Sequence, residues 1–248
     1  YMARSARTDK GASQTLKAVI GIRDLVFSGT VAPGERLSEI NVSAKLGLSR
    51  TPVRAALARL EQEGILEAIP SGGYSVRLFS IGDVADAIEI RGVLEGTAAR
   101  LAAERGATPT KINALKALVA RLDDVVETGV NDIDLDGYMS LNAEFHEMLT
   151  ELSGSRIIQR ELERVLHLPF ASPSAFLEAQ MSVPAFRTSL IVGQAQHRAI
   201  AHAIEMREGS RAEAVAREHA RLARINLDRV MKDKSLIDRV PGLVLVTG

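Results

Sequence analysis

The chain carries at positions 46–57 the segment Leu46-Gly47-Leu48-Ser49-Arg50-Thr51-Pro52-Val53-Arg54-Ala55-Ala56-Leu57. A glycine followed two residues later by a hydroxyl side chain predicts that one helix ends and another begins within a short turn. Pro52 suits the first turn of the second helix, where its missing N–H costs nothing. Two helices joined in this way, the second opening with positive charge, are typical of a helix-turn-helix.

The flanking residues extend this motif to a winged helix-turn-helix domain over residues 12–78. Apolar residues at helical spacing predict a helix over 16–26, and a turn is expected over 31–37. Ser38 caps the helix that ends at Gly47, and Ser49 caps the next helix. Alternating strands at 65–69 and 74–78 surround the turn at 70–73, which indicates a β-hairpin. The predicted order is three helices and then the hairpin.

The second helix of the pair carries side chains that are suited to DNA recognition. Arg50 and Arg54 lie one turn apart, and arginine is well shaped for bidentate contact with guanine in the major groove. A helix N-terminus with hydroxyl side chains suits phosphate oxygens, and a diglycine turn brings backbone close to the minor groove. The alternative is a solvated basic face without a partner. The candidate DNA contacts are Ser49, Arg50, Thr51, Arg54, Gly72 and Gly73.

Composition limits the class of protein. The chain has 248 residues, 46% hydrophobic and 25% charged, which predicts a soluble protein of one or two domains. There is no cysteine, so a disulfide framework, an iron–sulfur cluster and a thiolate zinc site are excluded. No apolar run reaches the roughly 18 residues of a membrane helix, and a signal peptide is absent from the polar first residues, so we expect a cytoplasmic protein. Aromatic residues make up 4% of the chain, which argues against base stacking on an aromatic sheet.

Charge is distributed unevenly along the chain. Residues 1–78 carry 11 lysines and arginines against 7 acidic residues, whereas residues 79–248 carry 20 against 24. The total is therefore zero only because the two parts cancel. A basic first domain on an acidic second domain indicates that only the first one meets a polyanion.

Residues 81–233 form a second, all-helical domain according to their periodicity. The pattern predicts six or seven helices and no strand, with breaks at Gly106/Pro109, near Gly129, at Gly154, at Pro169/Pro173, at Pro184 and at Gly209. The fold class is therefore mainly α, with an N-terminal winged helix-turn-helix followed by a helical bundle. The pattern predicts no element for residues 235–248.

Three histidines interrupt apolar stripes of this bundle. His146 lies one turn from Asn142 on a single helix face, and His197 and His219 occupy apolar rows of two later helices. A single inward histidine is more often a satisfied core residue, but three such groups are expensive to bury without a partner. A divalent metal ion would serve all of them, and imidazole with an oxygen donor suits zinc, nickel or another first-row ion.

Arg91 occupies the inward row of its predicted helix, between Ile88 and Glu95. One interpretation is an exposed ion pair with Glu95, four residues on, which contributes little. The other is a guanidinium that binds the carboxylate of a small effector.

Beyond these patterns, residues 33–76 resemble the winged-helix domain of the GntR family of bacterial transcription regulators. The similar segments are Pro33-Gly34-Glu35-Arg36-Leu37, residues 46–57, Leu60-Glu61-Gln62-Glu63-Gly64-Ile65-Leu66 and Gly72-Gly73-Tyr74-Ser75-Val76. The resemblance implies operator contacts by Arg50, Thr51 and Arg54 and a minor-groove contact at Gly72. Many members have an arginine where this chain has Ile40, so that phosphate contact is either absent or made by Lys45.

Residues 81–231 in turn resemble the FCD effector domain of the FadR-type branch of that family. The similar motifs are Leu141-Asn142-Ala143-Glu144-Phe145-His146, Gln196-His197-Arg198-Ala199-Ile200, Arg217-Glu218-His219 and the Arg91 segment 89–95. The resemblance implies that Asn142, His146, His197 and His219 are the metal ligands and that Arg91 binds the effector. Many members have aspartate at position 142, and the neutral amide of Asn142 is a weaker donor.

Together these features predict a homodimeric regulator that binds a palindromic operator in double-stranded DNA and responds to a small carboxylate effector. One alternative is a metal-dependent hydrolase in which the histidines hold an ion and Glu144 or Glu147 acts as base. It lacks a motif such as His-Glu-x-x-His, and it gives no role to the basic domain. A third interpretation is an architectural DNA-binding protein that has no effector.

Overall fold

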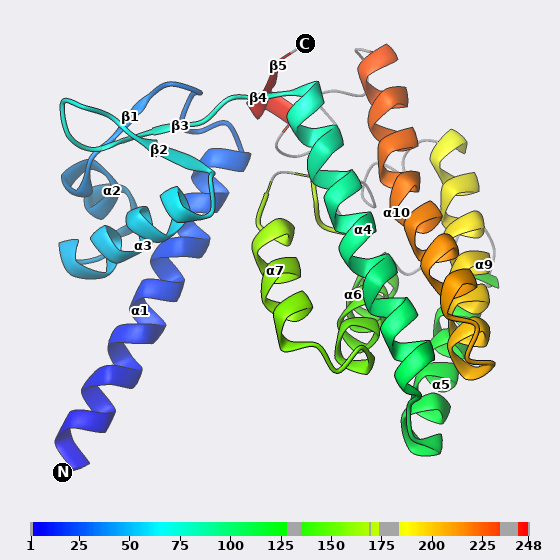
Figure 1. The fold of residues 1–248 in the computed structure, drawn as a ribbon. Helices are drawn as coiled ribbons and strands as arrows, with labels where there is room; N and C mark the ends of the chain where they lie inside the picture. Colours follow the sequence, from blue (N-terminus) through cyan, green and yellow to red (C-terminus); the bar gives the residue numbers. More distant parts are fainter. Residues whose placement is uncertain (1, 128–134, 169, 174–183, 234–242, 248) are drawn as a thin grey trace. The chain divides into compact units, whose positions relative to one another are not determined.

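The computed structural model describes residues 2–127, 135–168, 170–173, 184–233 and 243–247. The chain divides into two compact units, one of residues 1–82 with 241–248 and the other of residues 83–240. Helices dominate both units (Figure 1), which confirms the predicted mainly α class.

The first unit contains the predicted helix-turn-helix. Its elements are α1 (Met2–Phe27), β1 (Arg36–Leu37), α2 (Glu39–Leu46), α3 (Arg50–Gln62), β2 (Leu66–Ala68), β3 (Tyr74–Val76), β4 (Phe79–Ser80), the short 3₁₀ helix η2 (Leu243–Leu245) and β5 (Val246–Thr247). Ser38 caps α2 as predicted, because its hydroxyl accepts the Asn41 N–H at 3.2 Å. Gly47 ends α2 with a positive φ of 64°. Ser49 stands at the N-cap position of α3, but its hydroxyl makes no capping bond.

The wing has one strand more than the predicted hairpin. Strands β2 and β3 pair antiparallel, with Glu67 opposite Ser75. Residues 31–37 were expected to form only a turn, yet their last two residues form β1 and pair with β3, so that Leu37 lies opposite Tyr74 and is buried. A strand of two residues is too short to show the alternation from which strands are predicted.

Two ends of the first unit differ from the sequence pattern. Helix α1 begins at Met2, well before the predicted residue 16. From residue 14 on, where side-chain burial is described, the first buried apolar side chains of α1 are Ala18 and Val19, within the predicted range. The C-terminal tail, for which nothing was predicted, buries Leu243 and Leu245 and pairs β5 in parallel with β4.

The second unit is a bundle whose described helices are α4 (Ile81–Arg105), α5 (Pro109–Glu127), α6 (Leu135–Leu152), α7 (Arg156–Leu166), α9 (Pro184–Glu205) and α10 (Gly209–Lys232). The predicted breaks at Gly106/Pro109, Gly154, Pro184 and Gly209 match these bounds, whereas Gly129 lies outside the described residues. Aliphatic side chains such as Leu118, Leu149 and Ile200 fill the core together with Phe145. Among the helices of the described ranges, none combines the length and apolarity that a bilayer crossing requires.

Helices α4 and α10 approach each other closely through small residues. A Cβ added at Gly92 would lie 3.0 Å from the Cβ of Ala220, and one added at Gly96 would lie 3.1 Å from the carbonyl oxygen of Glu213. Both contacts are tighter than most Cβ contacts in proteins, so a larger residue at either position would require α10 to shift by a few tenths of an ångström. This approach brings Arg91, next to Gly92, against the backbone of α10.

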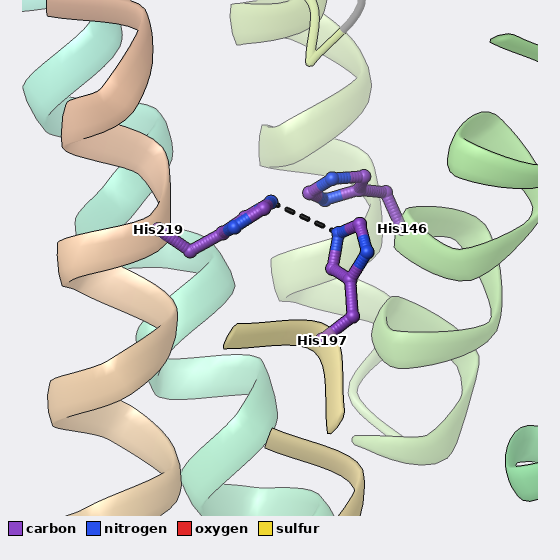
Figure 2. A group of neighbouring side chains, drawn as sticks. All are labelled: His146, His197 and His219. Atoms are coloured by element: carbon purple, nitrogen blue, oxygen red, sulfur yellow. Dashed lines mark hydrogen bonds between the residues drawn. The ribbon is translucent and has the colours of Figure 1, made fainter. Parts of the chain in front are cut away.

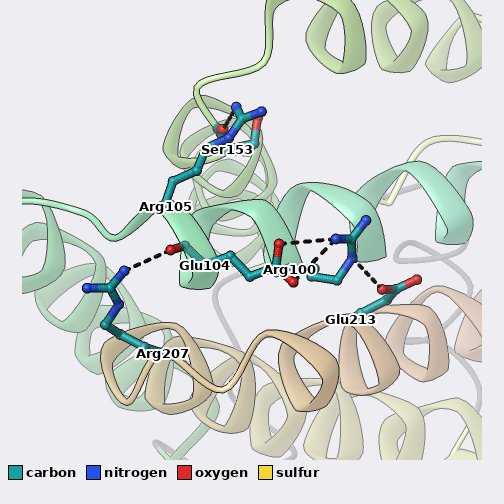
Figure 3. Close-up of polar contacts among 6 residues, drawn as sticks. All are labelled: Arg100, Glu104, Arg105, Ser153, Arg207 and Glu213. Carbon is teal, nitrogen blue, oxygen red and sulfur yellow. Dashed lines mark hydrogen bonds and ion pairs between the residues drawn. The ribbon is translucent and has the colours of Figure 1, made fainter.

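Polar contacts hold the C-terminal end of α4 to three neighbours (Figure 3). Arg100 donates to Glu213 of α10 at 2.8 Å, and Arg105 donates to the carbonyl of Ser153 after α6 at 2.6 Å. Arg207, between α9 and α10, donates to the carbonyl of Glu104 at 2.7 Å. The last two bonds use carbonyl groups that a helix end leaves unpaired, and all three fix α4 relative to the helices that carry the histidines.

Candidate functional site

The three predicted histidines meet inside the bundle (Figure 2). His146 comes from α6, His197 from α9 and His219 from α10, and one ring nitrogen of each lies within 4.8 Å of the other two. His146 and His197 are buried, and His219 is partly buried. The exposed His202 of α9 takes no part in this cluster.

The orientation of the His197 ring follows from its neighbours. Gln194 donates through Nε2 to Asp123 Oδ1 at 2.6 Å and to the Val119 carbonyl at 3.2 Å. Its Oε1 therefore faces His197 Nδ1, at 3.0 Å, and accepts a hydrogen bond from that nitrogen. In the neutral ring the proton is then on Nδ1, and Nε2 keeps its lone pair.

His219 is held in the same way. Gln196 Oε1 lies 3.2 Å from His219 Nδ1, and His219 Nε2 lies 3.0 Å from His197 Nε2. With both Nδ1 atoms directed at amide oxygens, two lone pairs face each other across 3.0 Å. A cation between or beside these nitrogens would remove that repulsion.

His146 completes the set. Its Nδ1 lies 2.9 Å from Glu95 Oε1, and its Nε2 is buried without a hydrogen-bond partner. Metal-binding histidines commonly turn their second nitrogen toward a carboxylate or amide oxygen, which is the arrangement of all three rings here. The donor set therefore fits a divalent ion.

Burial and neighbouring charges set the protonation of the cluster. Burial lowers the pKa of His197 well below its usual value, and it lowers the pKa of His219 to about 3. Burial acts to raise the pKa of Glu95, but the nearby His146 and Arg91 outweigh it and bring that pKa to about 2. Neutral imidazoles are the form that binds a metal.

Arg91 is buried beside this cluster, with 2% of its surface exposed. Its Nη2 donates to the Ala220 carbonyl at 3.1 Å, and its Nε lies 3.9 Å from Glu95 Oε2, too far for a hydrogen bond. Both Nε and Nη1 lack a hydrogen-bond partner. The Arg91–Glu95 pair considered from the sequence therefore exists, but it is buried and leaves two donor nitrogens open.

Two cavities border the histidines. The smaller, of about 40 Å³, is lined among others by Arg91, Tyr138, Asn142, Ser189, His219 and Asn226. The larger, of about 300 Å³, is lined among others by Glu95, His146, Glu147, Thr150, Leu162 and Glu163. Asn142 is thus on the Arg91 side of the cluster, one turn before His146.

On the first unit, the predicted recognition arginines project from the start of α3. Arg50 and Arg54 are 61% and 67% exposed, and both contact Glu39 at the start of α2. Arg54 donates to the two carboxylate oxygens at 2.6 and 2.9 Å, and Arg50 donates at 3.1 Å. The Arg54 hydrogen bond, with that of Arg50, lowers the pKa of Glu39 to about 2. Glu39 was not predicted, although a carboxylate directly after the Ser38 cap was a signal for it.

The other predicted DNA contacts lie on the surface of the same unit. Lys45, Ser49 and Thr51 are exposed around the helix-turn-helix turn, and Ile40 is 63% exposed at the start of α2.

The wing turn has the backbone of a diglycine loop. Gly72 and Gly73 have φ values of 88° and 89°, and a Cβ at Gly73 would lie 2.9 Å from the Leu37 carbonyl oxygen. Arg36 of β1 donates to the Ser71 carbonyl at 3.1 Å, which places a guanidinium beside the turn. Arg36 was not among the predicted DNA contacts, because residues 31–37 were expected to form only a turn.

Comparison with known protein families agrees with both units. Residues 15–76 match the family described as bacterial regulatory proteins, gntR family, and residues 86–222 match the FCD domain family. The chain belongs to the GntR family and carries an FCD domain. The predicted resemblances to the GntR family and to the FCD domain are thereby confirmed.

Relatives and solved structures fit this assignment. The chain is 30% identical over 159 residues to an uncharacterised HTH-type transcriptional regulator, YdhC, of Bacillus subtilis, covering 64% of this chain and 69% of that protein. It is 36% identical over 121 residues to the Nta operon transcriptional regulator of Aminobacter aminovorans, covering 49% and 55%. The structure of McbR/YncC of E. coli has the same fold, with a TM-score of 0.63 at 22% identity over 88% of this chain and 98% of that one. This GntR-family chain is therefore a DNA-binding transcription regulator, as its family and relatives are.

Proposed function

We propose that this regulator belongs to the FadR-type branch, binds a palindromic operator in the cytoplasm as a homodimer, and changes its operator affinity when a small carboxylate binds beside a metal ion in the FCD domain. The observation that carries the proposal is the meeting of three oriented histidines with a buried, incompletely paired Arg91.

The DNA contacts proposed are the exposed groups of the helix-turn-helix and the wing. Arg50 and Arg54 read base edges from the start of α3, Thr51 and Ser49 bind phosphate through their hydroxyls, and Lys45 adds a cation nearby. The Gly72–Gly73 turn enters the minor groove. One recognition helix reads only a few base pairs, so two protomers on a palindrome supply the specificity that one lacks.

The metal ligands proposed are His146, His197 and His219, with the Asn142 amide oxygen as a further donor. Zinc or nickel suits such a nitrogen-rich set without thiolate. A bound ion would supply a Lewis acid at this end of the effector site. Arg91 then neutralises the effector's carboxylate from the side of the smaller cavity.

The two activities are coupled by linkage. If the effector changes operator affinity, operator binding must change effector affinity by the same factor. A useful response needs a coupling of about 1–3 kcal/mol, or about 5- to 150-fold.

A hydrolase built on the same histidines has less support. Of its two candidate bases, Glu144 is exposed and lies 3.4 Å from Arg121 of α5, and Glu147 is exposed. Neither carboxylate has a hydrogen bond to the histidine cluster among the described contacts, and the family and relatives are regulators.

The metal is tested by elemental analysis of protein purified without an affinity tag or added metal. We expect about one ion per chain in the native protein and almost none in a His146→Ala/His219→Ala variant. A His202→Ala variant, which changes an exposed histidine of α9, serves as the control and should keep its ion. Equal, low metal content in all three proteins would remove the metal from the proposal.

The effector is tested by titrating short carboxylic acids against the complex of the full chain with its operator. We expect at least one acid to change operator affinity by about fivefold or more, and only in the protein that keeps its metal. A flat response to every acid would favour the architectural interpretation.

A further inference from the structure

The smaller cavity has two polar ends and an apolar middle. Along α10, His219 and Asn226 both line it, and seven residues of helix span about 10 Å. Along α9, Gly193 approaches His219 while Ser189 contacts Asn226, so the two helices define the same axis. Leu190 and Leu222 line the cavity as well.

Arg91 and His219 lie at one end of this cavity, the end proposed above for the effector carboxylate. Arg91 Nη2 is bonded to Ala220, the neighbour of His219, and its Nε and Nη1 keep no hydrogen-bond partner. This end therefore needs an anionic acceptor.

The other end offers a second open donor, on Asn226. This residue is fully buried, and its Nδ2 has no hydrogen-bond partner. Arg229 donates to Ser189 Oγ at 3.2 Å, and Ser189 in turn donates to Asn226 Oδ1 at 2.9 Å. This relay fixes the amide so that its NH₂ group, and not its oxygen, is left for another partner.

Buried donors without acceptors are rare and costly in folded proteins, which makes them a sign of a missing partner. Arg91 and Asn226 both line this cavity, and together they carry three unpartnered nitrogens, all of them donors. A ligand with an oxygen acceptor at each end would satisfy both residues. The cavity is small, at about 40 Å³, so the ligand must be short.

We infer that Asn226 is a specificity-determining residue for the effector, and that the effector is a short dicarboxylate whose second carboxylate accepts a hydrogen bond from Asn226 Nδ2. This inference rests on the proposed effector site and goes beyond it by naming the far end of the ligand. Arg91 binds the first carboxylate, and the leucines between the two ends contact the connecting methylene groups.

The test compares acids of equal carbon number that differ at the far end: malonate against propionate, and succinate against butyrate. Binding to the full-length, metal-loaded protein is measured by calorimetry, together with the effect of each acid on operator affinity. We expect at least one dicarboxylate to bind at least tenfold more tightly than its partner.

Variants of Asn226 locate the origin of that preference. Asn226→Ala should reduce the preference to less than about threefold while metal content and operator affinity stay unchanged. Asn226→Asp should reject dicarboxylates most strongly, because it places a negative charge where the donor was. Asn113→Ala, at an exposed position of α5, is the control.

The outcomes separate the two levels of the inference. If the native protein binds both members of each pair equally and Arg91→Ala abolishes both, the role of Asn226 is refuted and the effector site stands. If Asn226→Ala keeps the preference, the role is also refuted. If no acid of the panel binds the native protein, the effector site fails as well. The comparison of acids on the native protein needs no variant, so a folding defect cannot hide the result.

Discussion

The two units use arginine in opposite ways. Arg50 and Arg54 of the first unit are more than half exposed and share the carboxylate of Glu39, whereas Arg91 of the second unit is buried and keeps two nitrogens without a partner. Water and salt ions stabilise the charges of the two exposed arginines. Arg50 and Arg54 can therefore exchange Glu39 for DNA at little cost in free energy. Arg91 has no such solvent, and it therefore favours one small anion of matching shape. The difference separates recognition of a long polyanion from recognition of a metabolite.

Removing the exposed pair should have the largest effect. Each bidentate contact between an arginine and a base contributes substantially to the preference for the correct DNA sequence. Arg50→Ala/Arg54→Ala should therefore weaken specific operator binding by about 10²- to 10⁴-fold. Fluorescence anisotropy with labelled operator at fixed salt measures this loss. Arg59→Ala is the matched control, since Arg59 lies on the same helix and pairs with Glu63. Unchanged binding by the double variant would show that α3 is not the recognition helix.

Raising the salt concentration should weaken operator binding much more than effector binding. Each neutralised phosphate adds about −0.9 to the slope of log affinity against log salt. With about two phosphate contacts per protomer, a fourfold rise in salt should weaken operator binding by about a hundredfold. Effector binding at the buried Arg91 should change by less than about twofold, because buried charges are screened little. Equal salt dependence of the two affinities would contradict the comparison.

Changing the buried Arg91 should abolish the response to the effector and leave operator affinity unchanged. Arg91→Gln keeps an amide donor but loses the charge, and we expect the 5- to 150-fold effector response to disappear while operator affinity without effector stays within about twofold. Titrating the acid against the operator complex measures both quantities. Arg121→Gln changes an exposed arginine of α5 and should respond normally. A full response in Arg91→Gln would exclude a direct contact with the effector.

The smallest effect is expected at Glu39. Glu39→Gln removes the shared carboxylate of Arg50 and Arg54, and exposed ion pairs contribute little to stability. Thermal unfolding should therefore change little, whereas affinity for unrelated duplex DNA should rise up to about threefold as a negative charge leaves the binding surface. Weaker binding to unrelated DNA would instead assign Glu39 to positioning the two arginines.

Local chemistry made much of this arrangement predictable. Ser38, Gly47 and Pro52 act through neighbours a few residues away, so the helix-turn-helix could be read directly from spacing. The three histidines could be placed on inward helix faces because helical periodicity depends on a single element. Asn226 was missed although it follows His219 by two turns, because its role depends on Ser189 and Arg229 rather than on its own helix.

The amino-acid order alone therefore determined which residues cap, turn and face inward, since those properties arise within one helix or one turn. Only the tertiary structure decided that Arg91 is left with open donors, that residues 36–37 and 246–247 become strands, and that Asn226 shares a cavity with Arg91. Each of these depends on a partner from a distant part of the chain. Such partners are set by how helices and strands pack, which no local pattern records.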